Sequence, residues 1–252
     1  MSADMKSYVS ELLEGYRARE RKIAVLRYDL EHPSEVGVTE QIEAMNYGSG
    51  EGVGHSKGHV SNKTLYIALN YEEQAKQLNA FFDARLNVLL AENADASKEK
   101  QYHLKRQILP GIAAYETLQR VMPKEEALQT VHGYVERLAR TSHKQLAALL
   151  HIPGLYRLVP GVFVKSTRSV FGPAAGFAPK ELQTGNGVWR VDMMKCPYHD
   201  TCAEYGCPEL CRCFCDSDDI SYTGLHPKLI WERSMTLGRG NDRCDFCMKV
   251  EK

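Results

Sequence analysis

The cysteines constrain this chain more than any other feature of its sequence. All eight lie between Cys196 and Cys247, and none precedes them. In a secreted chain such a count would predict disulfides, whereas in a reducing compartment it predicts metal binding or thiol chemistry. The first residues lack the basic and then apolar segments of a signal peptide, and no run of about 18 apolar residues occurs. We therefore expect a cytoplasmic protein that does not cross a membrane.

The composition indicates a folded protein without a large excess of charge. The 252 residues are 43% hydrophobic and 25% charged, which predicts a proper core. The 32 basic residues balance 32 acidic ones, which argues against a strongly basic nucleic-acid-binding protein. We expect a small molecule as the partner, and the sequence leaves open whether the chain forms homo-oligomers.

The chain divides at a polar stretch, Glu92–Lys98, which has the composition of a linker. Apolar residues at helical spacing predict three helices before it, over residues 5–31, 39–45 and 65–90. The glycine-rich segment 48–58 matches neither GxGxxG nor a phosphate loop, so we interpret it as a plain loop. Residues 1–95 are then a helical extension or an appended regulatory module.

From residue 98 onward the pattern predicts an α+β domain, with helices first and a small antiparallel sheet with one inserted helix after them. One helix is expected over 104–118 with a kink at Pro110-Gly111, and another from Pro123, where proline and two acids suit the first turn. Two strands flank an Asn-Gly turn within 181–195. The remaining predicted elements are a helix over 200–216 and strands over 228–237 and 244–250.

Two cysteine-containing pairs in the block have the spacing of metal ligands. Cys196-x2-His199 and Cys244-x2-Cys247 each resemble a zinc knuckle. The 44 residues between them are too many for a compact zinc finger, but a sheet could bring the two pairs together. Zinc or an iron–sulfur cluster held by these four side chains is therefore one interpretation of the block.

The middle of the block suggests two further interpretations. On a single helix, Cys207, Cys211 and Cys215 would share one face, while Cys213 would point elsewhere. Such a face suits a soft metal, or it packs in the core as small apolar residues do. Redox sensing through Cys211, Cys213 and Cys215 is a third interpretation, because closely spaced thiols are candidates for oxidation.

Acid–base chemistry is also compatible with this segment. Cys215 and Asp218 are three residues apart, which makes them neighbours on a helix. A thiol becomes a nucleophile only as the thiolate, which needs a base or a cation nearby, such as Arg212, Arg233 or His199. Glu209 and Asp218 could act as general acid and base, although acids that cap a helix give the same pattern.

The order of these residues resembles the L-2-amino-thiazoline-4-carboxylic acid hydrolase family over about residues 98–252. The motifs are Gly206-x-Pro208-Glu209-Leu210, Cys215-x2-Asp218 and Arg233-x2-Thr236-Leu237-x2-Gly240-x3-Cys244-Asp245-Phe246. The closing segment also resembles small-ligand-binding domains of the vinyl-reductase type. Residues 1–95 resemble small phage-type regulatory proteins, on the segment Gly58-His-Val-Ser-Asn-Lys-Thr64.

The resemblance implies a hydrolase that opens a cyclic amidine and requires no cofactor. In the reaction that names the family, water adds to the thiazoline ring carbon, the ring C–S bond breaks, and N-carbamoyl-L-cysteine forms. From the chemistry of the matched side chains we expect Cys215 as nucleophile, Asp218 as base or as the group that orients the base, and Glu209 to protonate or bind the amidine. Among the expected substrate-binding residues, Arg233 would clamp the carboxylate and Thr236 would supply a hydroxyl hydrogen bond. Cys244 and Asp245 would shape the pocket wall. The other cysteines lie outside the family pattern and favour the metal or redox interpretations.

Overall fold

The computed structural model describes residues 62–251, with side chains from residue 76 onward. The residues from Phe82 onward form one compact unit, and the first part of α3 (Asn62–Glu92) belongs to another. The helix predicted over 65–90 is confirmed as α3. The other features predicted before residue 62 lie outside the described residues, namely the helices 5–31 and 39–45 and the loop 48–58.

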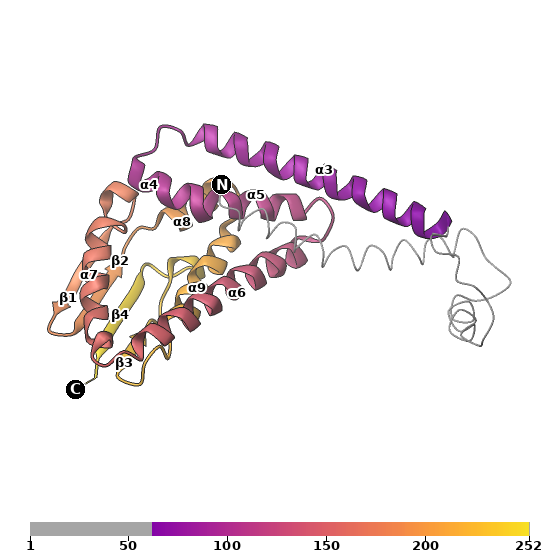
Figure 1. Ribbon diagram of the computed structural model, residues 1–252. Helices are drawn as coiled ribbons and strands as arrows, with labels where there is room; N and C mark the ends of the chain where they lie inside the picture. The colour runs from indigo at the N-terminus through magenta and orange to yellow at the C-terminus, as the bar shows by residue number, and fades with distance from the viewer. Residues whose placement is uncertain (1–61, 252) are drawn as a thin grey trace, which may run out of the picture. The chain divides into compact units, whose positions relative to one another are not determined.

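Helices form the first half of this unit, and a four-stranded antiparallel sheet follows (Figure 1). The helices are α4 (Lys98–His103), α5 (Leu109–Leu118), α6 (Lys124–Leu150), α7 (Val159–Ser169), α8 (Pro197–Glu204) and α9 (Cys211–Tyr222). The strands are β1 (Pro179–Gly185), β2 (Val188–Met193), β3 (Leu229–Glu232) and β4 (Cys244–Val250), in the spatial order β1-β2-β4-β3. The predicted α+β class is confirmed, because α8 and α9 are inserted between β2 and β3.

Proline residues account for two features of the helical half. Helix α6 begins directly after Pro123, with Glu125 and Glu126 in its first turn as predicted. At the predicted kink the chain forms a π-helical segment, η1 (Leu104–Ile108), immediately before α5. Pro110 lies at the start of α5 and has no amide hydrogen, which explains why the regular hydrogen-bond pattern is interrupted there.

Membrane crossing was tested on the described helices. No single one of them is long and apolar enough to span a bilayer. Helix α6 and the segment Leu155–Ser169 pass the length and composition test only as a pair, which is bent by 116°.

The hairpin of β1 and β2 forms as the sequence predicts. Asn186 and Gly187 make its two-residue turn with φ of 53° and 77°, values that only asparagine and glycine adopt readily. The register shifts between Glu181 and Gln183, which leaves Leu182 as a bulge in β1. Strand β1 is an edge strand, and so is β3, which is only four residues long.

Two predicted elements of the cysteine-rich half are wrong in extent. The single helix over 200–216 is two helices, because Gly206 adopts a left-handed φ of 71° and Pro208 follows it in the short 3-10 turn η4 (Pro208–Leu210). The strand expected over 228–237 ends at Glu232. Beyond Glu232 the chain turns, and residues Leu237–Arg239 form the 3-10 turn η5.

One face of the sheet is packed against helices, which builds the core. Its central side chains are Trp189 and Val191 of β2 and Met248 of β4, all buried. They pack with Leu150 at the end of α6 and with Phe163 of α7, the helix that lies over β1 and β2 in Figure 1. Burying one such side chain contributes about 1.5–3 kcal/mol, so this face fixes the register of the sheet.

Helix α9 packs against both α6 and α5, and the second contact depends on a glycine. A Cβ atom at Gly111 of α5 would lie 2.7 Å from Cζ of Phe214 on α9. The Phe214 ring also contacts Tyr198 of α8 at a centroid distance of 5.3 Å, so it is held from both sides. The absence of a side chain at Gly111 is therefore a packing requirement.

We expect Gly111→Ala to lower the free energy of unfolding by about 1–3 kcal/mol, because the added methyl group overpacks a site next to an aromatic ring. Denaturant unfolding of the purified chain measures this change. Gly133→Ala is the matched control: Gly133 is also helical, a Cβ there would meet no described atom within 4 Å, and the variant should gain about 0.5–1 kcal/mol. Equal effects of the two substitutions would contradict the packing argument.

Candidate functional site

A buried arginine joins the end of β3 to α9. The Arg233 side chain is only 1% exposed. Its Nη1 donates to Oδ2 of Asp218 at 3.2 Å, and its Nη2 donates to Oδ2 of Asp219 and to the carbonyl oxygen of Cys215, both at 2.6 Å. Burial opposes the charge of the guanidinium, but Asp218 and Asp219 outweigh it and raise the pKa of Arg233. A buried cation therefore pairs with two partly exposed carboxylates.

Asp218 has the environment of a group that exchanges protons near neutral pH. Burial raises the pKa of its carboxyl to about 6, against the lowering effect of Arg233. Its side chain nevertheless keeps 41% of its surface accessible. Asp218 is therefore partly accessible to a reagent while its surroundings disfavour the charged carboxylate. Burial, together with the negative charge of the nearby Asp218, raises the pKa of Tyr222 to about 12.

Cys215 lies one turn before Asp218 on the same helix, as the spacing predicts. Its sulfur is 3.9 Å from the sulfur of Cys211, which is completely buried. The contact between the two thiols lowers the pKa of Cys215 and raises that of Cys211. Burial and Asp218 oppose this ionisation, whereas Arg233 and the amide of Gly238 favour it. Cys215 is thus the thiol with a lowered pKa on α9.

Of the predicted residues, Cys244 lies close to this group, and Thr236 follows Arg233 by three residues in the chain. Cys244 is buried, accepts the amide hydrogen of Leu237 at 3.3 Å, and has a pKa that burial raises to about 11, with the charge of Cys215 adding to the rise. Thr236 is 1% exposed, and its hydroxyl has no hydrogen-bond partner among the described residues. We call Cys215, Asp218, Arg233 and Cys244 the thiol–carboxylate cluster.

Glu209 and Asp245 make other contacts. Glu209 accepts hydrogen bonds from Tyr115 of α5 at 2.7 Å and from Lys124 of α6 at 2.8 Å. Burial works against its charge, but these partners outweigh it and lower the pKa of Glu209. Asp245 accepts hydrogen bonds from the amides of Ser234 and Met235 at 2.8 and 2.6 Å, which fixes the chain after β3. Both carboxylates therefore hold structural elements together.

The four predicted metal ligands do not converge. Cys244 and Cys247 lie on opposite faces of β4, because residues three apart on a strand point in opposite directions. His199 of α8 contacts Asp200 at 3.2 Å, and Cys196 is desolvated beside Cys244 and Cys215, with a raised pKa. Within residues 76–251, no group of three or more His, Cys, Asp or Glu side chains has an arrangement that could hold a metal ion.

The shared face expected for three cysteines is also wrong. Cys207 lies before the 3-10 turn η4, which separates it from α9, and its amide donates to the carbonyl oxygen of Cys202 on α8 at 2.8 Å. Cys213 is buried, and burial raises its pKa to about 12. All eight cysteines are free thiols.

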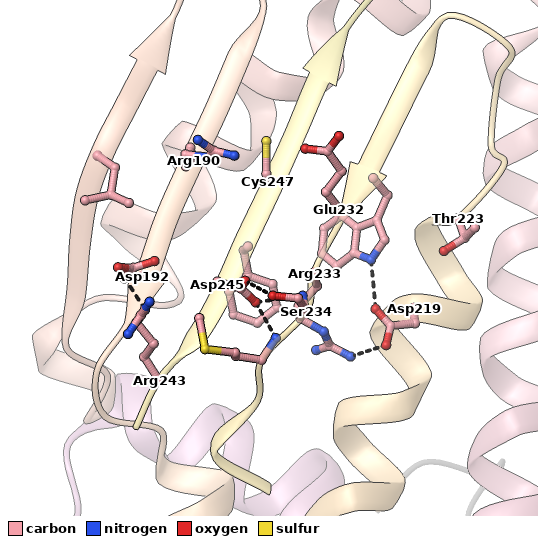
Figure 2. Close-up of a pocket in the computed structure, with 14 residues that line it drawn as sticks. Arg190, Asp192, Asp219, Thr223, Glu232, Arg233, Ser234, Arg243, Asp245 and Cys247 are labelled. Atoms are coloured by element: carbon pink, nitrogen blue, oxygen red, sulfur yellow. Dashed lines mark hydrogen bonds and ion pairs between the residues drawn. The ribbon is translucent and has the colours of Figure 1, made fainter. Parts of the chain in front are cut away.

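A cavity of about 640 Å³ lies along the other face of the sheet and around its β3 edge, and it shares Arg233 with the thiol–carboxylate cluster (Figure 2). The sheet residues that form it are paired across strands: Arg190 lies opposite Cys247, and Asp192 opposite Asp245. In Figure 2 the Cys247 thiol lies between Arg190 and Glu232. Of the residues predicted from the sequence, this cavity contains Arg233, Asp245 and Cys247.

Most charged groups of this cavity are already paired. Asp192 lies 3.2 Å from Arg243, Glu232 lies 2.5 Å from Lys249, and Asp219 accepts from Trp231 as well as from Arg233. The sequence analysis did not single out the cavity residues Arg190, Asp192, Asp219, Trp231, Glu232 and Arg243. The polar residues that alternate with Trp189, Val191 and Met193 along β2 were a usable signal, because they mark the face of the sheet that the core does not cover.

Gly238 in η5 leaves room for both sulfurs of the Cys211–Cys215 pair. A Cβ atom there would lie 2.8 Å from Sγ of Cys215 and 3.2 Å from Sγ of Cys211. We therefore expect Gly238→Ala to displace the pair and to slow alkylation of Cys215 by iodoacetamide at neutral pH, because the thiolate loses its donors. Peptide mass spectrometry over time measures the rate, and Gly161→Ala, whose Cβ would meet no described atom within 4 Å, is the control. An unchanged rate in Gly238→Ala would contradict this account.

Comparison with known proteins gives one match. No curated protein and no solved structure matches the chain. A family model described as L-2-amino-thiazoline-4-carboxylic acid hydrolase matches residues 101–248, which include the whole thiol–carboxylate cluster and nearly all of the sheet. The match covers more than half of the chain, so the chain belongs to the L-2-amino-thiazoline-4-carboxylic acid hydrolase family.

Proposed function

We propose that this protein hydrolyses a small cyclic amidine that carries a carboxylate, of the type of 2-amino-thiazoline-4-carboxylate. One observation carries the proposal. In a member of this family, a thiol with a lowered pKa lies one helical turn from a carboxyl group with a pKa of about 6. A nucleophile beside an acid–base group of this pKa is the arrangement that opening of a thiazoline ring needs.

The thiol–carboxylate cluster supports this chemistry better than the cavity of Figure 2 does. The cavity has one thiol among its described lining residues, Cys247, and burial raises its pKa, so it is a poor nucleophile at neutral pH. The carboxylates Asp192, Glu232 and Asp245 each have cationic or amide partners, as described above. We therefore assign the reaction to Cys215 and Asp218.

In the proposed first stage, Asp218 takes the proton of Cys215 as the sulfur attacks the amidine carbon, and the C=N electron pair moves to nitrogen. The nitrogen pair then re-forms the double bond, the ring C–S bond breaks, and Asp218 returns the proton to the leaving sulfur. The substrate is now an open-chain isothiourea bonded to Cys215. This step exchanges one C–S bond for another and consumes no water.

In the second stage, Asp218 takes a proton from a water molecule that attacks the same carbon. The C=N electron pair moves to nitrogen in this addition. The tetrahedral centre then collapses to a carbonyl as its hydroxyl proton passes to that nitrogen, the bond to Cys215 breaks, and Asp218 returns its proton to the sulfur. The net change is the addition of one water, which gives a product of the N-carbamoyl-cysteine type. No metal or organic cofactor takes part in this proposal, and the partner is the small-molecule substrate alone.

The contacts change two of the roles expected from the sequence. Both Nη atoms of Arg233 are engaged by Asp218, Asp219 and a carbonyl, so we infer that Arg233 positions the acid–base group and does not clamp the substrate carboxylate. Glu209 is held by Tyr115 and Lys124, and we infer a structural role for it. Thr236 keeps its proposed role, since its buried hydroxyl has no partner in the described part of the chain.

We expect Cys215→Ser to abolish turnover of 2-amino-thiazoline-4-carboxylate, because a hydroxyl group is not ionised near neutral pH. Liquid chromatography with mass detection measures formation of N-carbamoyl-cysteine. Cys213→Ser is the control, because Cys213 lies on the same helix and outside the cluster, and it should keep its activity. Turnover at the unmodified rate in Cys215→Ser would contradict the nucleophile role.

The pH dependence tests Asp218. The base is active when deprotonated, so kcat/KM should rise about tenfold per pH unit below pH 6 and level off above it. We expect Asp218→Asn to lose this limb of the profile together with most of its activity. A profile of kcat/KM from about pH 4.5 to 8 in both proteins provides the measurement. If activity instead fell as the pH rose through 6, Asp218 would act as the acid of the first chemical step.

A further inference from the structure

The Cys211–Cys215 pair has a feature that the proposed reaction does not need. Hydrolysis requires one nucleophilic thiol, yet a second sulfur lies 3.9 Å from it. Cys211 is completely buried, whereas Cys215 remains partly accessible. A reagent that enters the site therefore meets Cys215 first and finds Cys211 directly behind it.

The surroundings of the pair keep the two sulfurs together. Cys211 and Cys215 occupy successive turns of α9, and Gly238 lies across from both, with no side chain to separate them. The lowered pKa of Cys215 and the raised pKa of Cys211 give the two thiols unequal reactivity. With this arrangement an oxidant reacts first with Cys215, and the thiol of Cys211 can then attack the oxidised sulfur of Cys215.

We propose that Cys215 and Cys211 form an oxidation site at which a hydroperoxide reversibly converts the reactive thiol into an intramolecular disulfide. The thiolate of Cys215 attacks the peroxide, the O–O bond breaks, and Cys215 becomes a sulfenic acid while the peroxide is reduced to water or an alcohol. Cys211 then attacks that sulfur, an S–S bond forms, and the hydroxyl leaves as water. Two thiols are oxidised and one peroxide is reduced.

The position of Cys211 at the first residue of α9 makes closure feasible. Residues four apart on a helix have Cβ atoms about 5–6 Å apart, whereas a disulfide needs about 3.5–4.5 Å. The first turn of α9 must therefore tighten. It is the end of the helix, next to the 3-10 turn η4, so tightening affects a helix terminus and not a helix interior. A second pair, Cys202 and Cys207, is buried on both sides and provides an internal comparison.

The bridge would remove the sulfur that the proposed reaction uses. Oxidation would therefore stop hydrolysis, and a dithiol reductant would restore it. This second part rests on the proposed function, whereas formation of the bridge does not. Formation of the disulfide and its effect on hydrolysis can therefore be tested independently.

The full chain is treated with hydrogen peroxide and then analysed by intact mass and by peptide mapping without reduction. We expect the loss of two hydrogens and one Cys211–Cys215 peptide cross-link, both reversed by dithiothreitol. Cys211→Ser, which keeps a hydroxyl donor beside Cys215, should instead accumulate a sulfenic acid that dimedone traps. Cys202→Ser should form the Cys211–Cys215 bridge as the unmodified chain does. Thermal melting of each variant checks that it is folded.

Several outcomes would overturn the oxidation site. One is a cross-link between Cys202 and Cys207 alone, and another is sulfinic or sulfonic acid at Cys215 at the same rate with and without Cys211. A mapped bridge that leaves hydrolysis unchanged would overturn the proposed role of Cys215 as nucleophile and leave the oxidation site standing. A mapped bridge with reversible loss of hydrolysis supports both.

Discussion

The buried guanidinium of Arg233 is the interaction on which the rest of the site depends. A cation removed from water is stable only when acceptors surround it, and here Asp218, Asp219 and the carbonyl of Cys215 do so. These acceptors all belong to α9, so one side chain at the end of β3 fixes the helix against the sheet. The guanidinium is buried while the two carboxylates stay partly exposed, so removing either one leaves the buried cation with fewer acceptors and lowers the free energy of unfolding. The same contacts orient Asp218 beside Cys215, so stability and reactivity depend on one arrangement.

Much of the fold could be predicted because its signals are local. The Asn186-Gly187 turn requires backbone angles that few residues adopt, and Pro123 with its two acids marks a helix start. The helix predicted over 200–216 failed for the opposite reason. Cysteines at intervals of four favour a continuous helix, but Gly206 and Pro208 stop it. Two residues that disfavour helical backbone therefore end a helix even where the side-chain pattern around them is helical.

The site residues also differ in how far the sequence could predict their neighbours. Cys215 and Asp218 were predicted together because three residues on one helix determine their separation. Glu209 was expected beside them, but its partner Tyr115 is 94 residues away in the sequence, and no local pattern reveals such a contact. The metal interpretation relied on the spacing of Cys244 and Cys247, which implies proximity on a loop. On a strand the same spacing sends the two side chains to opposite faces.

The edges of the sheet, described above as a bulged β1 and a short β3, also affect how the chain meets other copies of itself. A strand from another molecule adds to a sheet by completing the unpaired backbone hydrogen bonds of an edge. The bulge at Leu182 interrupts that row on one side, and β3 offers only four residues on the other. Neither edge is a good template, so the sheet disfavours aggregation by strand addition.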